Sequence, residues 1–190
     1  MLNEIKSFMQ DVDKGLIEIY NEFSLQHELG IYLRNALPNQ RVQFERNISF
    51  FGANPRLSSF CKKEIDISLF TAVRNCVQSK DSAIELKLPQ NGQYPEQMYS
   101  FIKDISFMEQ VKNNLGFSSS YCLTVVQDKL FFSGDKTNGI YSFFRTGNTI
   151  NGRIFKPTGN QANIDSITIS GLYNIKWIHL KNYSYYVLSI

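Results

Sequence analysis

Two stretches of sequence, KKEIDISLF at residues 62–70 and SAIELKLP at residues 82–89, decide how this chain folds. In each stretch apolar and polar residues alternate with a period of two, which indicates a β-strand with one face in the core. The opposite face carries Asp66 in the first strand, and Glu85 and Lys87 in the second. If the two strands pair, Asp66 comes within side-chain reach of Glu85. The apolar face of the pair consists of Ile65, Ile67, Leu69, Ile84, Leu86 and Leu88.

Helical spacing of apolar residues appears at three places outside these strands. It predicts helices over residues 2–23, 25–36 and 95–114. Gly15 interrupts the first segment and is expected to split or bend it. Ser24 is the expected N-cap of the second helix.

Further strands are predicted on both sides of the central pair. The alternation returns in residues 41–50, which Asn54-Pro55 should end as a turn, and residues 121–127 form a strand of buried type. Shorter strands are expected near residues 130–132, 139–145 and 151–155, followed by a hairpin of residues 175–180 and 185–190 that turns at residues 181–182.

The resulting element order is helix, three strands, helix, strand and then extra strands. It predicts an α/β (α+β) fold in which a mixed sheet is flanked by helices. A chain of 190 residues suits one hydrophobic core, so residues 1–190 are expected to form a single domain. The core of that domain spans about residues 24–127, and residues 128–190 form a C-terminal β-rich extension.

Composition narrows the class of protein. No apolar run is long enough to span a membrane, and the charged first 15 residues lack the apolar stretch of a secretory signal, so the chain is expected to be cytoplasmic. The three cysteines are scattered and form no CxxC pair, which argues against a disulfide framework or a zinc site. With only His27 and His179, any bound metal must be a hard ion held by oxygen.

Charge and aromatic residues concentrate in the last third of the chain. Residues 128–190 hold seven basic and three acidic side chains, interleaved with many aromatic rings. This mixture suits a polyanionic partner, because bases stack on aromatic rings and phosphates contact the cations. Core packing of a β-rich extension explains the same aromatic residues, and both interpretations stay open.

The charged face of the two central strands has the composition of a metal site. Two neighbouring carboxylates repel each other unless a cation neutralises them, and Mg²⁺ favours such oxygen ligands together with a substrate phosphate. Lys87 could then orient a water molecule or stabilise negative charge in the transition state. A Glu-x-Lys sequence is also common on the solvent-exposed face of an amphipathic strand, and the spacing alone does not decide between the two.

IDI at residues 65–67 followed by IELK at residues 84–87 resembles the motif of the PD-(D/E)XK nuclease superfamily. The resemblance implies the restriction-endonuclease-like αβββαβ core, with Asp66 and Glu85 as metal ligands and Lys87 as a catalytic residue. It also implies a metal-binding glutamate from the first helix, which Glu28 would supply, and a catalytic glutamine on the helix after the motif, which Gln97 would supply. Ile65 stands where the name of the motif has proline.

The resemblance implies a nuclease that hydrolyses phosphodiester bonds of nucleic acid, most naturally DNA, with Mg²⁺ or Mn²⁺ as cofactor. A role in restriction or defence and a homodimer that cuts both strands would agree with it. The alternative is a module that keeps the nuclease fold but only binds nucleic acid or protein. Asp104 in the third helix and Glu45 in the first strand are expected to have structural and surface roles.

Overall fold

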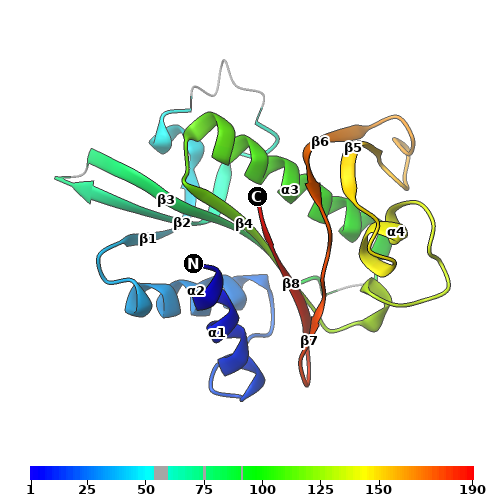
Figure 1. Ribbon diagram of the computed structural model, residues 1–190, viewed down its shortest axis with the longest axis horizontal. Coiled ribbons are helices and arrows are strands. Elements are labelled where there is room, and N and C mark those ends of the chain that lie inside the picture. The colour runs from blue at the N-terminus through cyan, green and yellow to red at the C-terminus, as the bar shows by residue number, and fades with distance from the viewer. Residues whose placement is uncertain (54–59, 75, 91) are drawn as a thin grey trace.

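The computed structural model describes residues 1–53, 60–74, 76–90 and 92–190, and the predicted turn at Asn54-Pro55 lies outside them. A six-stranded sheet with the order β1-β2-β3-β4-β8-β7 forms the centre, and β5 and β6 form a separate two-stranded ribbon (Figure 1). The strands are β1 Arg41–Asn47, β2 Glu64–Val73, β3 Cys76–Lys87, β4 Ser119–Val126, β5 Ile150–Phe155, β6 Ser166–Tyr173, β7 Ile178–His179 and β8 Ser184–Ser189.

Strand directions confirm a mixed sheet. The β1–β2 and β2–β3 pairs are antiparallel, whereas β3 and β4 are parallel and are joined by the crossover helix α3, Tyr94–Leu115. The β4–β8 and β8–β7 pairs are again antiparallel. Strands β1 to β4 are therefore preceded by two helices, and α3 stands between β3 and β4, in the predicted order.

Helices cover both faces of this sheet. The helices α1, Leu2–Asp13, and α2, Glu22–Ala36, lie on one face, and α3 lies on the other (Figure 1). Ile84 and Leu86 pack on the α1/α2 side, while Ala83 packs on the α3 side with Phe101. Because both faces are buried, the strand face that carries Glu85 lies beneath α3, and Glu85 is only 1% exposed. The interpretation that Glu85 of the Glu-x-Lys sequence lies on a solvent-exposed strand face is therefore wrong.

The first two helices differ from their predicted bounds for local reasons. Gly15, with φ +73°, follows the end of α1 at Asp13 and separates it from α2. The N-cap of α2 is Asn21 rather than the predicted Ser24. Ser24 is the third helical residue instead, and the two residues form a reciprocal capping box.

Three short segments predicted as strands are helical. Residues 48–51 form the 3₁₀ helix η1, Ile48–Phe51, and η2, Lys129–Phe131, replaces the strand expected at residues 130–132. The segment expected as a strand at residues 139–145 is the helix α4, Ile140–Arg145. A short apolar run cannot reveal its periodicity, and the Asp128 carboxylate that caps Leu130 N–H favours the turn.

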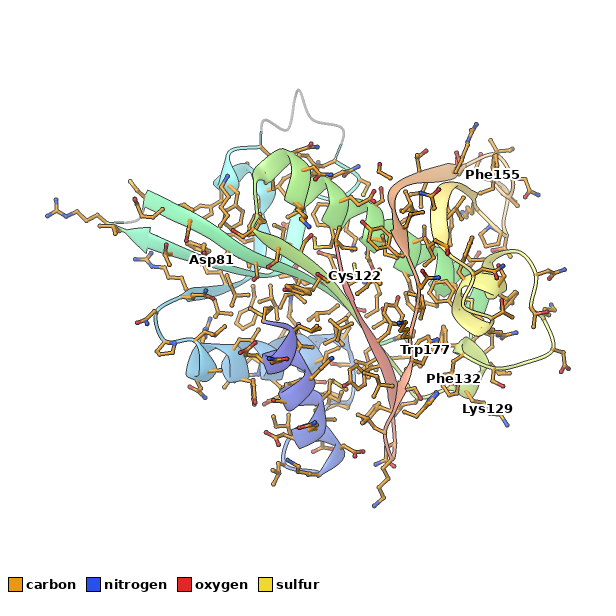
Figure 2. All side chains as sticks on the ribbon, viewed as in Figure 1. Asp81, Cys122, Lys129, Phe132, Phe155 and Trp177 are labelled. Carbon is orange, nitrogen blue, oxygen red and sulfur yellow. The ribbon has the colours of Figure 1, made fainter. Side chains whose placement is uncertain are left out.

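The last third of the chain contributes a strand to the main sheet and side chains to the main core. Strand β8 adds directly to β4, and Phe131, Phe144 and Tyr186 are buried in the core on the α3 side. Trp177 is partly buried, contacts the Phe132 ring and donates its indole N–H to the carbonyl oxygen of Phe144 (Figure 2). Core packing therefore accounts for many of these aromatic residues. Among the described residues, no helix is long and apolar enough to cross a membrane.

Candidate active site

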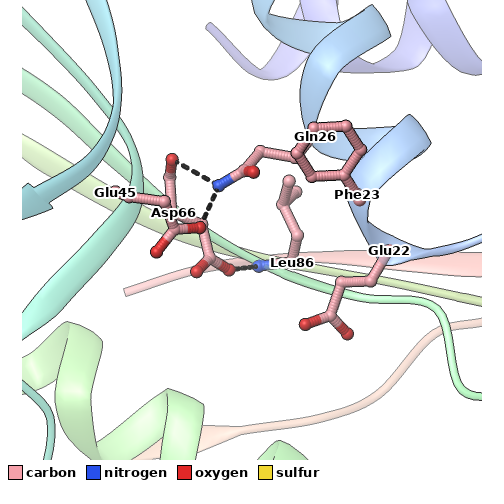
Figure 3. Close-up of a pocket in the computed structure, with 6 residues that line it drawn as sticks. All are labelled: Glu22, Phe23, Gln26, Glu45, Asp66 and Leu86. Atoms are coloured by element: carbon pink, nitrogen blue, oxygen red, sulfur yellow. Dashed lines mark hydrogen bonds between the residues drawn. The ribbon is translucent and has the colours of Figure 1, made fainter.

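Asp66 and Glu85 lie beside each other on paired strands. Ile67 of β2 is opposite Ile84 of β3, so Asp66 and Glu85 are the next residues along the two strands. The backbone N–H of Asp66 donates to Glu85 Oε1 at 3.3 Å. The N–H of Leu86 donates to Asp66 Oδ2 at 2.7 Å (Figure 3). Each carboxylate is therefore held by the backbone of the other strand.

A second lysine, Lys62, contacts the buried carboxylate of Glu85. The Lys62 ammonium donates to Glu85 Oε2 and forms an ion pair with Asp104 Oδ1, which α3 brings over the sheet. The side chains of Glu85 and Asp104 are almost fully buried, whereas that of Lys62 is 30% exposed. Lys62 thus bridges two buried negative charges from the solvent side.

Lys87 joins the same cluster from the end of β3. Its ammonium lies 3.2 Å from Glu22 Oε1 and 3.6 Å from Asp104 Oδ2, and it donates to the carbonyl oxygen of Leu86 at 3.0 Å. Four carboxylates and two ammonium groups therefore form a connected site. We call this set the charge cluster: Glu22, Asp66, Glu85, Asp104, Lys62 and Lys87.

The electrostatics of the charge cluster favour bound protons. Burial raises the pKa of Asp66 to about 6, against the opposing effects of the Leu86 N–H and of Lys62 and Lys87. Burial also raises the pKa of Glu85 well above its usual range; Asp66 and Asp104 add to the shift, and Lys62 opposes it. If every group were ionised, the cluster would carry two more negative than positive charges. Burial is thus the main reason why the pKa values of these carboxyl groups are raised, and at Glu85 the neighbouring negative charges add to it.

A cavity of about 290 Å³ opens beside Asp66 (Figure 3). Its walls come from the N-terminal part of α2 and from the first three strands. Gln26 fixes this wall, because its amide N–H groups donate to Glu45 Oε1 at 2.5 Å and to the carbonyl oxygen of Asp66 at 2.8 Å. The lining residues are Glu22, Phe23, Gln26, Glu45, Asp66 and Leu86. Three carboxylates therefore border one solvent-connected space.

The two remaining predicted residues, Glu28 and Gln97, belong to α2 and α3. Glu28 has a side chain that is 39% exposed, with Oε1 3.7 Å from His27 Nδ1, and it does not line the cavity. Glu22, six residues earlier on α2, lines the cavity and pairs with Lys87. Gln97 is partly buried in the first turns of α3, and its carbonyl oxygen accepts a hydrogen bond from the Ser100 hydroxyl. It stands seven residues before Asp104 and so lies on the same helix face.

Sequence reasoning missed several members of this site. Asp104 had a signal, because it is a charged residue within the apolar stripe of α3 and so had to be buried with a partner. Glu22 and Gln26 are four positions apart and therefore share one face of α2. Lys62 had no signal beyond its place before β2, because its contacts depend on how α3 packs. Glu45 is exposed, as expected, and also lines the cavity.

The donors of the charge cluster fit a hard divalent cation. All the anionic donors are carboxylate oxygens, and the excess negative charge equals that of one dication. No group of three or more His, Cys, Asp or Glu side chains in the described part of the chain has the geometry of a complete metal site. A cation at Asp66 and Glu85 would therefore use two protein carboxylates and complete its shell with water or substrate oxygens.

Comparisons with family models, with curated proteins and with solved structures found no match for this chain. The fold and the charge cluster are thus the basis for assigning a function.

Proposed function

We propose that the protein is a divalent-metal-dependent nuclease that hydrolyses phosphodiester bonds of DNA. One observation carries the proposal: Asp66 and Glu85 occupy neighbouring positions on paired strands, and Lys87 belongs to the same charge cluster beside a solvent-connected cavity. The order α2-β1-β2-β3-α3-β4, with β3 and β4 parallel, supports a restriction-endonuclease-like fold.

Asp66 and Glu85 would hold Mg²⁺ or Mn²⁺, and the ion would supply a polarised phosphoryl oxygen and a bound water of lowered pKa. The backbone N–H groups of Asp66 and Leu86 hold the carboxylates of Glu85 and Asp66 in place. Lys87 would place its positive charge near the phosphate, where it stabilises the charge that develops during hydrolysis. Glu22 holds Lys87 at this position and is the acid that α2 adds to the site.

Cleavage of plasmid and single-stranded DNA with Mg²⁺ or Mn²⁺ tests the proposal. We expect Asp66→Asn, Glu85→Gln and Lys87→Met each to lower the cleavage rate about a hundredfold or more. Glu22→Gln and Glu28→Gln form a matched pair on one helix, and only the former should slow cleavage. Equal rates in wild type and in the Asp66, Glu85 and Lys87 variants would reject the nuclease assignment.

A second candidate function is metal-independent binding of nucleic acid by a module of the same fold. The contact between Lys62 and Glu85 favours it, because an ammonium already neutralises a carboxylate that a metal would need. This candidate predicts DNA binding that is unchanged by a chelator and no cleavage by any variant.

A further inference from the structure

We infer that Lys62 is an internal counter-cation that competes with a divalent cation for Glu85 and so weakens metal binding at the charge cluster. The inference rests on the proposed function only in taking a divalent cation as the ligand of this site.

The first step is the geometry of the Lys62 ammonium. It lies between Glu85 Oε2 and Asp104 Oδ1, and both carboxylates are buried. The other oxygen of Glu85, Oε1, accepts the backbone N–H of Asp66. Both oxygens of Glu85 therefore have partners, and a cation that binds Glu85 Oε2 competes with the Lys62 ammonium for it.

The second step is that the Lys62 ammonium can leave. The Lys62 side chain is 30% exposed, so water can solvate a displaced ammonium, whereas Glu85 and Asp104 cannot move out of the core without exposing the sheet. Lys62 also stands before β2 rather than within it. Lys87 is held differently, because it pairs with Glu22 and Asp104 and has no contact with Glu85 among the ion pairs of the described residues.

The third step separates competition for Glu85 from a general effect of charge. Replacing Lys62 alone frees Glu85, but it also makes the net charge of the charge cluster more negative by one unit charge. Replacing Lys62 and Asp104 together frees Glu85 while one charge of each sign is lost, so the net charge of the cluster stays the same. A competition mechanism predicts tighter metal binding in both variants, and a purely long-range effect predicts it only in the first.

The experiment is a calorimetric titration of the full chain with Mn²⁺ alone. We expect Lys62→Met and the double variant Lys62→Met/Asp104→Asn to bind Mn²⁺ at least about tenfold more tightly than wild type. Lys63→Met is the matched control, because Lys63 is the exposed neighbouring lysine outside the charge cluster, and its affinity should equal that of wild type.

Unchanged or weaker Mn²⁺ affinity in the double variant would overturn the inference. If both Lys62 variants fail to fold, as circular dichroism would show, Lys62 is a structural counterion and the inference is equally overturned. A wild type that binds Mn²⁺ with the expected dependence on Lys62 but cuts no nucleic acid would reject the proposed function and leave this inference standing. If the wild type cuts DNA but the Lys62 variants bind Mn²⁺ with wild-type affinity, this inference is rejected and the proposed function stands.

Discussion

Burial of the Asp66 carboxyl group lowers the free energy of unfolding at pH values where this group is ionised. Its pKa is about 6 instead of the usual 3.8, so between these values the folded protein binds a proton that the unfolded chain has released. The free energy of unfolding should therefore fall as the pH rises from about 4 to 6, by at most about 3 kcal/mol for this group. Asp66→Asn removes this cost, because an amide oxygen can still accept the Leu86 N–H without carrying charge.

We expect Asp66→Asn to be more stable than wild type at pH 8 and to lose that advantage at pH 4. Urea unfolding at both pH values measures the difference, and Glu28→Gln controls for the loss of one negative charge from a half-exposed position. Parallel pH dependences of wild type and Asp66→Asn would contradict the assignment of the shift to Asp66.

At the scale of single residues, the sequence predicted the part of the site that a local rule controls. Alternation along two paired strands was enough to place Asp66 beside Glu85, because neighbours in a ladder are set by register. The contacts of Lys62 and Asp104 follow from how α3 crosses the sheet, and no local rule determines that. The same limit applies to α2, since spacing along a helix does not say that the turn with Glu22 faces a cavity. Glu28 was named by the resemblance alone and stays a prediction.

At the scale of elements, Glu109 of α3 fastens the β5–β6 ribbon to the main body. Its buried carboxylate accepts the backbone N–H groups of Ser170 and Gly171, the latter at 2.6 Å, and the hydroxyl of Tyr173 at 3.0 Å. We expect Glu109→Ala to increase hydrogen exchange at the Ser170 and Gly171 amides at least about tenfold, because charge-assisted hydrogen bonds to both are lost. Exchange in β2 and β3 serves as the internal control and should stay slow. Unchanged exchange at both amides would show that the ribbon is held by its apolar contacts alone.

The bounds of α3 and β2 were predicted within a few residues, because both elements are long enough for their periodicity to be read. Strand β3 begins at Cys76, six residues before its predicted start, and α1 ends at Asp13, ten residues before the predicted end of the first helix. The 3₁₀ helices and α4 span six residues or fewer, so their apolar residues fit a strand equally well. Strand β6, which pairs with β5, was not predicted.

For the whole molecule, the last strands are part of the sheet that holds the site. The core predicted over residues 24–127 omits β8, although β8 pairs with β4 along six residues and Tyr186 is buried against the rest. We expect a fragment of residues 1–127 to show no cooperative unfolding in urea. Without residues 128–190, the edge of β4 is unpaired and apolar side chains of α3 are exposed to water. The full chain is the control. A sharp, cooperative transition in the fragment would contradict a single shared core.

The pairing of Ser184 with Val126 also has a consequence during synthesis. A ribosome makes β4 well before β8, and in that interval the nascent chain presents the unpaired edge of β4 to its surroundings. Such an edge is a template for pairing with other chains, so the emerging polypeptide is most vulnerable to aggregation then, and chaperone assistance would matter most at that stage.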